Sequence, residues 1–75
     1  MGRLAGFSGR EVARVAERSG WAYQRTRGDD MIYAKAGQAR NLSVPAHREL
    51  KEGITRALIA TMEMTVDEFL AIARK

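Results

Sequence analysis

Apolar residues recur at helical spacing near the start of the chain. Between residues 12 and 16 they occupy positions i, i+3 and i+4, which predicts an amphipathic helix with one buried face. Ser8 and Glu11 form the capping-box pattern that begins such a helix, and Gly20 suits a left-handed residue at its end. The preceding residues 1–7 carry two glycines and no periodicity, so we expect a flexible N-terminal arm there.

The centre of the chain follows a strand pattern instead. Residues 21–27 and 30–35 are rich in aromatic and β-branched side chains, and Gly28-Asp29 between them is a turn sequence. This arrangement predicts a β-hairpin. A second turn at Gly37 leads to a third strand over residues 40–44, so that three consecutive strands form an antiparallel meander.

Alternation along the first strand predicts which of its side chains are buried. Successive strand residues point to opposite faces of a sheet, so Trp21 and Tyr23 share a face that we expect to anchor the core. Arg25 and Arg27 would continue that same face outward. We therefore expect aromatic residues at the buried end of the first strand and arginines at its exposed end.

Helical spacing returns after Pro45, which ends the third strand because it cannot donate a ladder hydrogen bond. We expect a helix over residues 52–62, and a second capping box from Thr65 to Glu68 opens a short C-terminal helix. The buried stripe expected on the first of these two helices comprises Ile54, Ala57, Leu58 and Thr61.

The order of these elements defines the expected architecture. We predict an α+β fold in which a three-stranded antiparallel sheet has helices packed on one face, with a short additional helix at the C-terminus. The order α-β-β-β-α is that of a double-stranded-RNA-binding-domain-like fold. Residues 8–75 would form this single domain.

Composition excludes several classes of function. The 75 residues contain no cysteine and one histidine, which rules out a disulfide framework, a thiolate nucleophile and, in effect, a His/Cys metal site. The sequence has no phosphate-binding glycine loop and no metal-ligand cluster, so we expect neither a metal nor a small-molecule cofactor. No stretch approaches the roughly 18 apolar residues of a membrane span. We expect a cytoplasmic protein without membrane contact.

The charge distribution favours a polyanionic partner. The net charge is +4, and residues 1–56 hold 11 Arg and Lys against 6 Asp and Glu. Nucleic acid is the commonest partner of so basic a surface. Arg10, Arg14 and Arg18 line up at i+4 steps on the first helix. A solvated face paired with nearby glutamates and an RNA contact both fit this stripe, and we favour the solvated face.

Six short motifs are spread along residues 8–70. They are Ser8-Gly9-Arg10-Glu11-Val12, Gly20-Trp21, Arg25-x-x-Gly28-x-x-x-x-Tyr33, Val44-Pro45-x-His47, Glu49-Leu50-Lys51-x-Gly53 and Glu68-Phe69-Leu70. In this order and spacing they resemble the HicA family, which are small toxins of toxin–antitoxin systems. The resemblance implies a ribosome-independent endoribonuclease that cleaves mRNA without a metal, and a HicB-like antitoxin protein that keeps it silent.

The resemblance also implies a catalytic histidine in a Gly-Ser-His or Gly-Asp-His turn, and here the sequence departs from the family. The turn is Gly28-Asp29-Asp30, so Asp30 holds the histidine position. An exposed aspartate is ionised near neutral pH and serves as a base but not as an acid, whereas RNA cleavage needs both. Three interpretations stay open: a turn residue in a protein that has lost cleavage, a working base in a slower enzyme, or a selected or engineered detoxified variant.

The remaining site residues follow from charge and position. His47, beyond the third strand, is a second catalytic candidate; the alternative is that it only orders its loop. The residues expected to bind RNA are those of the hairpin and its basic neighbours, namely Arg25, Arg27, Gly28, Lys35, Arg40 and Lys51. Two functions fit this pattern: a HicA-like mRNA endoribonuclease, or a catalytically inactive module that binds RNA or an antitoxin.

Overall fold

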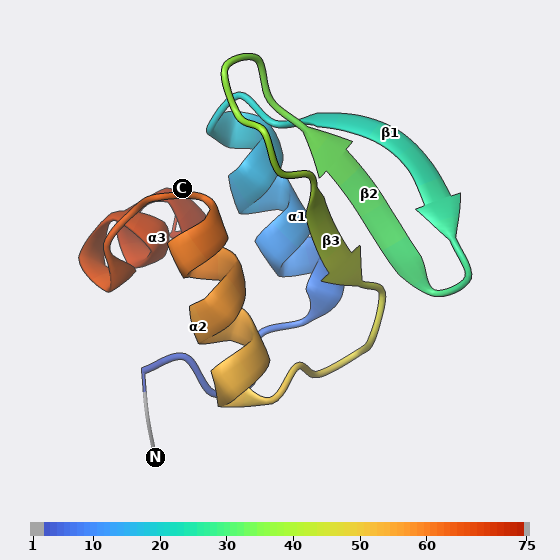
Figure 1. Cartoon of the computed structure of the whole chain (residues 1–75). Coiled ribbons are helices and arrows are strands. Elements are labelled where there is room, and N and C mark those ends of the chain that lie inside the picture. The colour runs from blue at the N-terminus through green and yellow to red at the C-terminus, as the bar shows by residue number, and fades with distance from the viewer. Residues whose placement is uncertain (1–2, 75) are drawn as a thin grey trace.

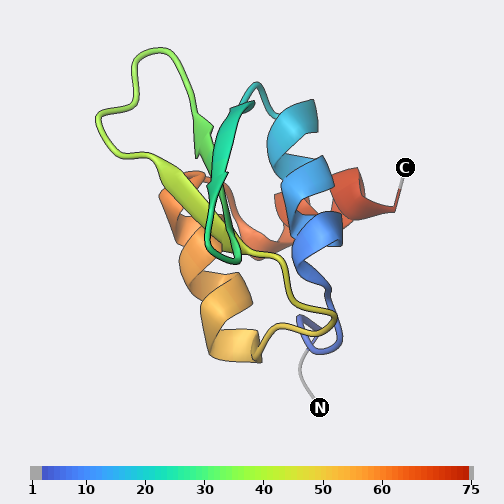
Figure 2. The same ribbon diagram turned by 90° about the vertical axis from the view of Figure 1, so that its right-hand side faces the viewer.

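The computed structural model describes residues 3–74 of the chain; residues 1, 2 and 75 lie outside it. The described residues fold into helices and one antiparallel sheet, joined by turns and loops. In chain order the elements are α1 (Gly9–Arg18), β1 (Ala22–Arg27), β2 (Asp30–Ala34), β3 (Leu42–Pro45), α2 (Glu52–Thr61) and α3 (Val66–Ala73). The predicted α+β order, α-β-β-β-α with a short additional helix, is confirmed. All of these helices lie on one side of the sheet, and the other side carries none of them (Figures 1 and 2).

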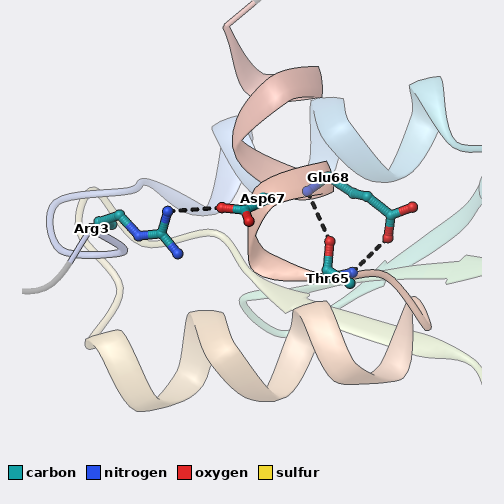
Figure 3. Close-up of polar contacts among 4 residues, drawn as sticks. All are labelled: Arg3, Thr65, Asp67 and Glu68. Atoms are coloured by element: carbon teal, nitrogen blue, oxygen red, sulfur yellow. Dashed lines mark hydrogen bonds and ion pairs between the residues drawn. The ribbon is translucent and has the colours of Figure 1, made fainter.

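Both predicted capping boxes form. At the start of α1, the Ser8 hydroxyl accepts a hydrogen bond from the Glu11 amide at 3.1 Å, and the Glu11 carboxylate accepts one from the Ser8 amide at 2.8 Å. Thr65 and Glu68 make the same two bonds at the start of α3, at 3.0 and 2.7 Å (Figure 3). Each box satisfies two amides that the first helical turn leaves unpaired, so the local sequence alone fixes where these helices begin.

The predicted hairpin is confirmed, in a sheet with strand order β1-β2-β3. Gly28 and Asp29 connect β1 to β2, and Gly28 has a φ of +62°, as the first central residue of a type II′ turn requires. In β3, Leu42 and Val44 are fully buried and belong to the hydrophobic core beneath the helices. The sheet therefore has one buried side and one side without helical cover.

A bulge in β1 changes the side of the sheet on which its residues lie. Tyr23 pairs with Tyr33, which faces α1, but the next paired residue is Arg25, opposite Ile32. Gln24 is the extra residue. Because directly paired residues share a face, Tyr23 lies on the helix side and Arg25 on the open side. Our prediction that they share one face is wrong, since nothing in the local sequence signals the bulge.

The two aromatic residues expected to anchor the core differ in burial. Trp21 is 3% exposed and belongs to the core, as predicted. Tyr23 is 52% exposed, so that part of the prediction is wrong. The reason is the position of β1, an edge strand whose residues are all exposed and which runs along the side of the sheet away from α2 and α3 (Figure 1).

The buried face of α2 is rotated by one residue from the predicted stripe. Thr55, Leu58 and Ile59 are buried, whereas Ile54 is 39% exposed and Ala57 is also exposed. Both sets follow the i, i+3, i+4 spacing, so the pattern alone does not choose between them. Packing of α2 against β3 and α3 makes the choice, although it buries the Thr55 hydroxyl without a hydrogen-bond partner among residues 3–74.

The segment before α1 packs into the core. Leu4 is fully buried, and the ring of Phe7 packs edge-on against the buried ring of Phe69 in α3, with 5.0 Å between ring centroids. Arg3 forms an exposed ion pair of 2.8 Å with Asp67 of the same helix (Figure 3). Apolar residues of the segment expected as an N-terminal arm therefore complete the contact with α3.

Candidate functional site

The turn of the hairpin, the loop after β3 and the start of α1 meet at one end of the molecule. The Ala46 amide donates to the Asp29 carbonyl oxygen at 2.7 Å, which ties the loop to the hairpin turn. The Gly9 amide donates to the His47 carbonyl oxygen at 2.9 Å, which ties the same loop to α1. Main-chain hydrogen bonds thus hold together three segments that are far apart in sequence.

Gly9 makes this close approach possible. A Cβ atom at position 9 would lie 1.8 Å from the Pro45 carbonyl oxygen and 3.1 Å from the Ala46 Cα, so a side chain does not fit. The obstructing atoms are backbone atoms, which cannot rotate away as a side chain does. The position of the loop relative to α1 and the hairpin therefore depends on glycine at this residue.

Asp30 is the first residue of β2 and lies on the open side of the sheet. Its register partners are Arg27 on β1 and Pro45 on β3, and its side chain is half-buried between them. Arg25 pairs with Ile32, which is two residues beyond Asp30 and therefore on the same face. The open side thus presents one carboxylate with two exposed arginines beside it.

These two arginines are available to bind an anion. Within residues 3–74, neither Arg25 nor Arg27 has an acidic side chain within 4.0 Å. Guanidinium groups bind phosphate through paired hydrogen bonds, and a neighbouring carboxylate is able to accept a proton. The carboxylate also repels a phosphate, so in this arrangement the arginines would bind the phosphodiester and Asp30 would act only as a base.

The model of one protein family, the HicA toxin of bacterial toxin–antitoxin systems, matches residues 9–64. The match covers more than half of the chain and runs from α1 through the sheet and α2. The chain belongs to the HicA toxin family. A comparison with curated proteins gives no match.

In this HicA-family chain, the loop of His47 lies beside the hairpin turn. The residue before it, Ala46, is the one hydrogen-bonded to Asp29, so His47 and Asp30 are at the same end of the molecule. The imidazole is exposed and makes no hydrogen bond within residues 3–74. We considered ordering of the loop as the alternative role of the His47 side chain. The structure instead holds the loop by its main chain, through the hydrogen bond from the Gly9 amide to the His47 carbonyl oxygen.

The six residues predicted to bind RNA are not brought into one cluster. Those at the hairpin are Arg25, Arg27 and Gly28. Lys35 follows the opposite end of β2, where its side chain lies over Gly20. At about 3.4 Å per strand residue, Lys35 is roughly 17 Å from Asp30. Only the hairpin group adjoins the Asp30 position.

Arg40 and Lys51 lie in two further places. Arg40 lines an open hollow of about 420 Å³ between the β2–β3 connection and the C-terminal end of α2. Lys51 is the N-cap residue of α2 and follows Leu50, whose amide bonds to the Phe7 carbonyl. The charge of Arg40 and Lys51 gives no indication in the sequence that they lie away from the hairpin arginines. Their distance from the hairpin is set by how the sheet and the loops fold.

Neither a metal-binding cluster nor a membrane-spanning helix is found among residues 3–74 of this HicA-family chain. Within residues 3–74, no three His, Asp or Glu side chains come together in a group that would hold a metal ion. None of the helices in the same range has the length and apolar character needed to cross a membrane.

A groove that the sequence analysis missed lies on the helix side of the hairpin. It has a volume of about 210 Å³ and is lined by Arg10, Ala13, Arg14, Glu17, Met31 and Tyr33. The Tyr33 hydroxyl donates to the Glu17 carboxylate at 3.0 Å. Burial, and then this hydrogen bond, raises the pKa of Tyr33 to about 12. The signal in the sequence was the i+4 spacing of the α1 arginines, for which we favoured a solvated face.

Proposed function

We propose that this HicA-family chain is the toxin of a type II toxin–antitoxin pair and that its fold acts on mRNA as an endoribonuclease. The observation that carries the proposal is the family match over residues 9–64, together with the place of residue 30 on the open side of the hairpin beside two exposed arginines. The α-β-β-β-α order, expected for a double-stranded-RNA-binding-domain-like fold, supports RNA as the substrate.

Cleavage on this surface follows from the chemistry of the side chains. Arg25 and Arg27 bind the scissile phosphate, and Asp30 takes the proton of the ribose 2′-hydroxyl. The 2′-oxygen then bonds to phosphorus, the bond to the 5′-oxygen breaks, and the products are a 2′,3′-cyclic phosphate and a 5′-hydroxyl. The leaving 5′-oxygen needs a proton from a second group, because it departs on the side of phosphorus opposite the 2′-oxygen, where Asp30 has taken its proton. His47 or water would supply it, which predicts slow cleavage.

The protein partner of the proposed toxin is a HicB-like antitoxin. Within residues 3–74, no acidic side chain forms an ion pair with the exposed hairpin residues Arg25 and Arg27. An antitoxin that blocks RNA must cover this surface, and acidic residues on it would complement the arginines. RNA and antitoxin would therefore compete for the same side chains.

One observation favours a second function, a catalytically inactive module that binds RNA or the antitoxin. Residue 30 is aspartate where the resemblance implies histidine, so the surface lacks the side chain that donates and accepts protons near neutral pH. In this alternative the fold and the arginines serve binding alone.

Cleavage of a labelled mRNA fragment by purified protein tests the proposal. We expect Asp30→His to cleave at least about 100-fold faster than the native chain, because a positioned acid–base group contributes roughly 10²–10⁴-fold. Asp29→His is the matched control, since it makes the same change one residue earlier, in the exposed turn, and should not accelerate cleavage. If the native chain cleaves no RNA, the inactive-module function replaces the proposed one, whatever the activity of Asp30→His.

A further inference from the structure

The groove between α1 and the hairpin is on the opposite side of the sheet from Asp30. Met31 and Tyr33 line it, and they alternate along β2 with Asp30 and Ile32 of the open side. Its other wall is α1, which contributes Arg10 and Arg14 four residues apart on one face. The proposed cleavage surface makes no use of these groups.

An exposed tyrosine stands beside this groove in a fixed orientation. The ring of Tyr23 packs edge-on against Tyr33, with 5.7 Å between ring centroids and 71° between the ring planes. Its hydroxyl is 2.6 Å from the Thr26 hydroxyl, which restrains the ring further. Tyr23 nevertheless remains 52% exposed. A large aromatic ring is thus held in place at the surface without being part of the core.

The groove carries net positive charge. Within residues 3–74, Arg10 and Arg14 have no acidic side chain within 4.0 Å. The one carboxylate in the lining, Glu17, accepts the hydrogen bond from Tyr33. Two guanidinium groups against one engaged carboxylate leave a surface that attracts an anion.

We propose that this groove binds single-stranded RNA, with phosphates on Arg10 and Arg14 and a base stacked on Tyr23. The proposal rests on the proposed function, which makes RNA the substrate. A basic groove with an adjacent aromatic platform is the combination that binds single strands without sequence preference. β1 is an edge strand, and Arg25 lies on the open side of the sheet, so an RNA strand passing around this edge meets arginines on both sides of the hairpin.

Fluorescence anisotropy with a short labelled single-stranded RNA tests the groove. Its 2′-hydroxyls are methylated, so binding is measured without cleavage. For Arg10→Gln/Arg14→Gln, the slope of log K against log salt should fall in magnitude by about 1.4, since each single-strand phosphate contact contributes about 0.7. The charge-matched control is Arg56→Gln/Arg74→Gln, on α2 and at the end of α3, which should leave the slope as in the native chain.

The stacking step has its own matched pair of variants. Tyr23→Ala should weaken binding roughly tenfold, in line with the loss of one base–aromatic stack. Tyr23→Phe keeps the ring and loses only the hydroxyl, so it should bind like the native chain. Far-ultraviolet circular dichroism confirms the fold of each variant, and because Tyr23 is exposed, this pair decides the question if the arginine variant unfolds.

The outcomes separate the groove from the proposed function. If the native chain binds RNA and the groove variants bind equally well, the groove proposal is wrong and the proposed function stands. If the native chain binds no RNA even at low salt, RNA as the substrate is wrong as well. If the variants lose affinity for a HicB-like antitoxin while RNA binding is unchanged, the groove is a protein interface, which also overturns the proposal.

Discussion

Substituting alanine for Gly9 tests the contact that joins α1 to the loop of His47. The new Cβ would lie 1.8 Å from the Pro45 carbonyl oxygen, so the helix and the loop must separate. Overpacking of this kind costs about 1–3 kcal/mol, and the hydrogen bond from the Gly9 amide contributes roughly 0.5–1.5 kcal/mol more. Alanine gains up to about 1 kcal/mol in helix propensity, which leaves a net loss of roughly 0.5–3.5 kcal/mol with a central value of about 2 kcal/mol.

Thermal and urea unfolding measure this loss. For a domain of this size, 1 kcal/mol corresponds to about 4–8 °C in Tm, so the central loss of about 2 kcal/mol predicts that Gly9→Ala lowers Tm by roughly 8–16 °C. Gly53→Ala is the matched control, because within residues 3–74 no atom outside its chain neighbours and its own helix backbone lies within 4 Å of the Cβ that it adds in α2. It should raise the stability by up to about 1 kcal/mol, the usual gain of alanine over glycine in a helix.

Two results would refute the reasoning. If Gly9→Ala is as stable as the native chain, the close approach of α1 to Pro45 is not a property of the folded protein. If both alanine variants lose the same stability, the loss at position 9 arises from the substitution itself and not from the contact. If Gly9→Ala loses stability and Gly53→Ala does not, the contact between α1 and the loop is established. A change in RNA cleavage by Gly9→Ala is then attributed to displacement of the loop.

Three further predictions concern single side chains. In the folded chain the pKa of Tyr33 is raised to about 12, whereas its ordinary value is 10.0. The protonated Tyr33 hydroxyl therefore contributes fully to the free energy of unfolding below pH 10, and this contribution is lost as the pH rises through about 12. Unfolding midpoints of Tyr33→Phe should therefore fall less over this range than those of the native chain, and an identical fall would contradict the assignment. Glu63 has a φ of +58°, and Glu63→Gly should stabilise the chain by roughly 0.5–1 kcal/mol despite losing its hydrogen bond to Gln38, whereas Glu63→Ala should give no gain in Tm. Charge reversal in Arg27→Glu should weaken RNA binding and antitoxin binding together, and titrations in which only one of them changes would show that the two surfaces are separate.

Features encoded within a few residues could be predicted from the sequence. The capping boxes at Ser8 and Thr65 form as expected, because donor and acceptor are three residues apart and need no tertiary partner. The hairpin at Gly28 forms for a similar reason: two β-rich runs flank a residue that accepts positive φ. These local signals were enough to give the order of helices and strands.

Features that depend on contacts between distant residues could not be predicted. The bulge at Gln24 moves Tyr23 and Arg25 to opposite sides of the sheet, and no residue in β1 marks it. The choice between two helical stripes in α2 depends on β3 and α3, which sequence periodicity does not include. The requirement for Gly9 arises from Pro45, which is 36 residues away in the chain. The place of the candidate site at the hairpin is a prediction from the sequence, whereas the groove on the helix side was not predicted.

Growth after induced expression tests the central claim, that residue 30 on the open side of the hairpin is the catalytic position of this HicA-family chain. The native chain, Asp30→His and the control Asp29→His are expressed to equal levels, and growth and mRNA integrity are followed. We predict that Asp30→His arrests growth and degrades mRNA far faster than the native chain, and that Asp29→His behaves like the native chain. If Asp30→His is no more toxic than the native chain while remaining folded, residue 30 is not the catalytic position and the account is wrong.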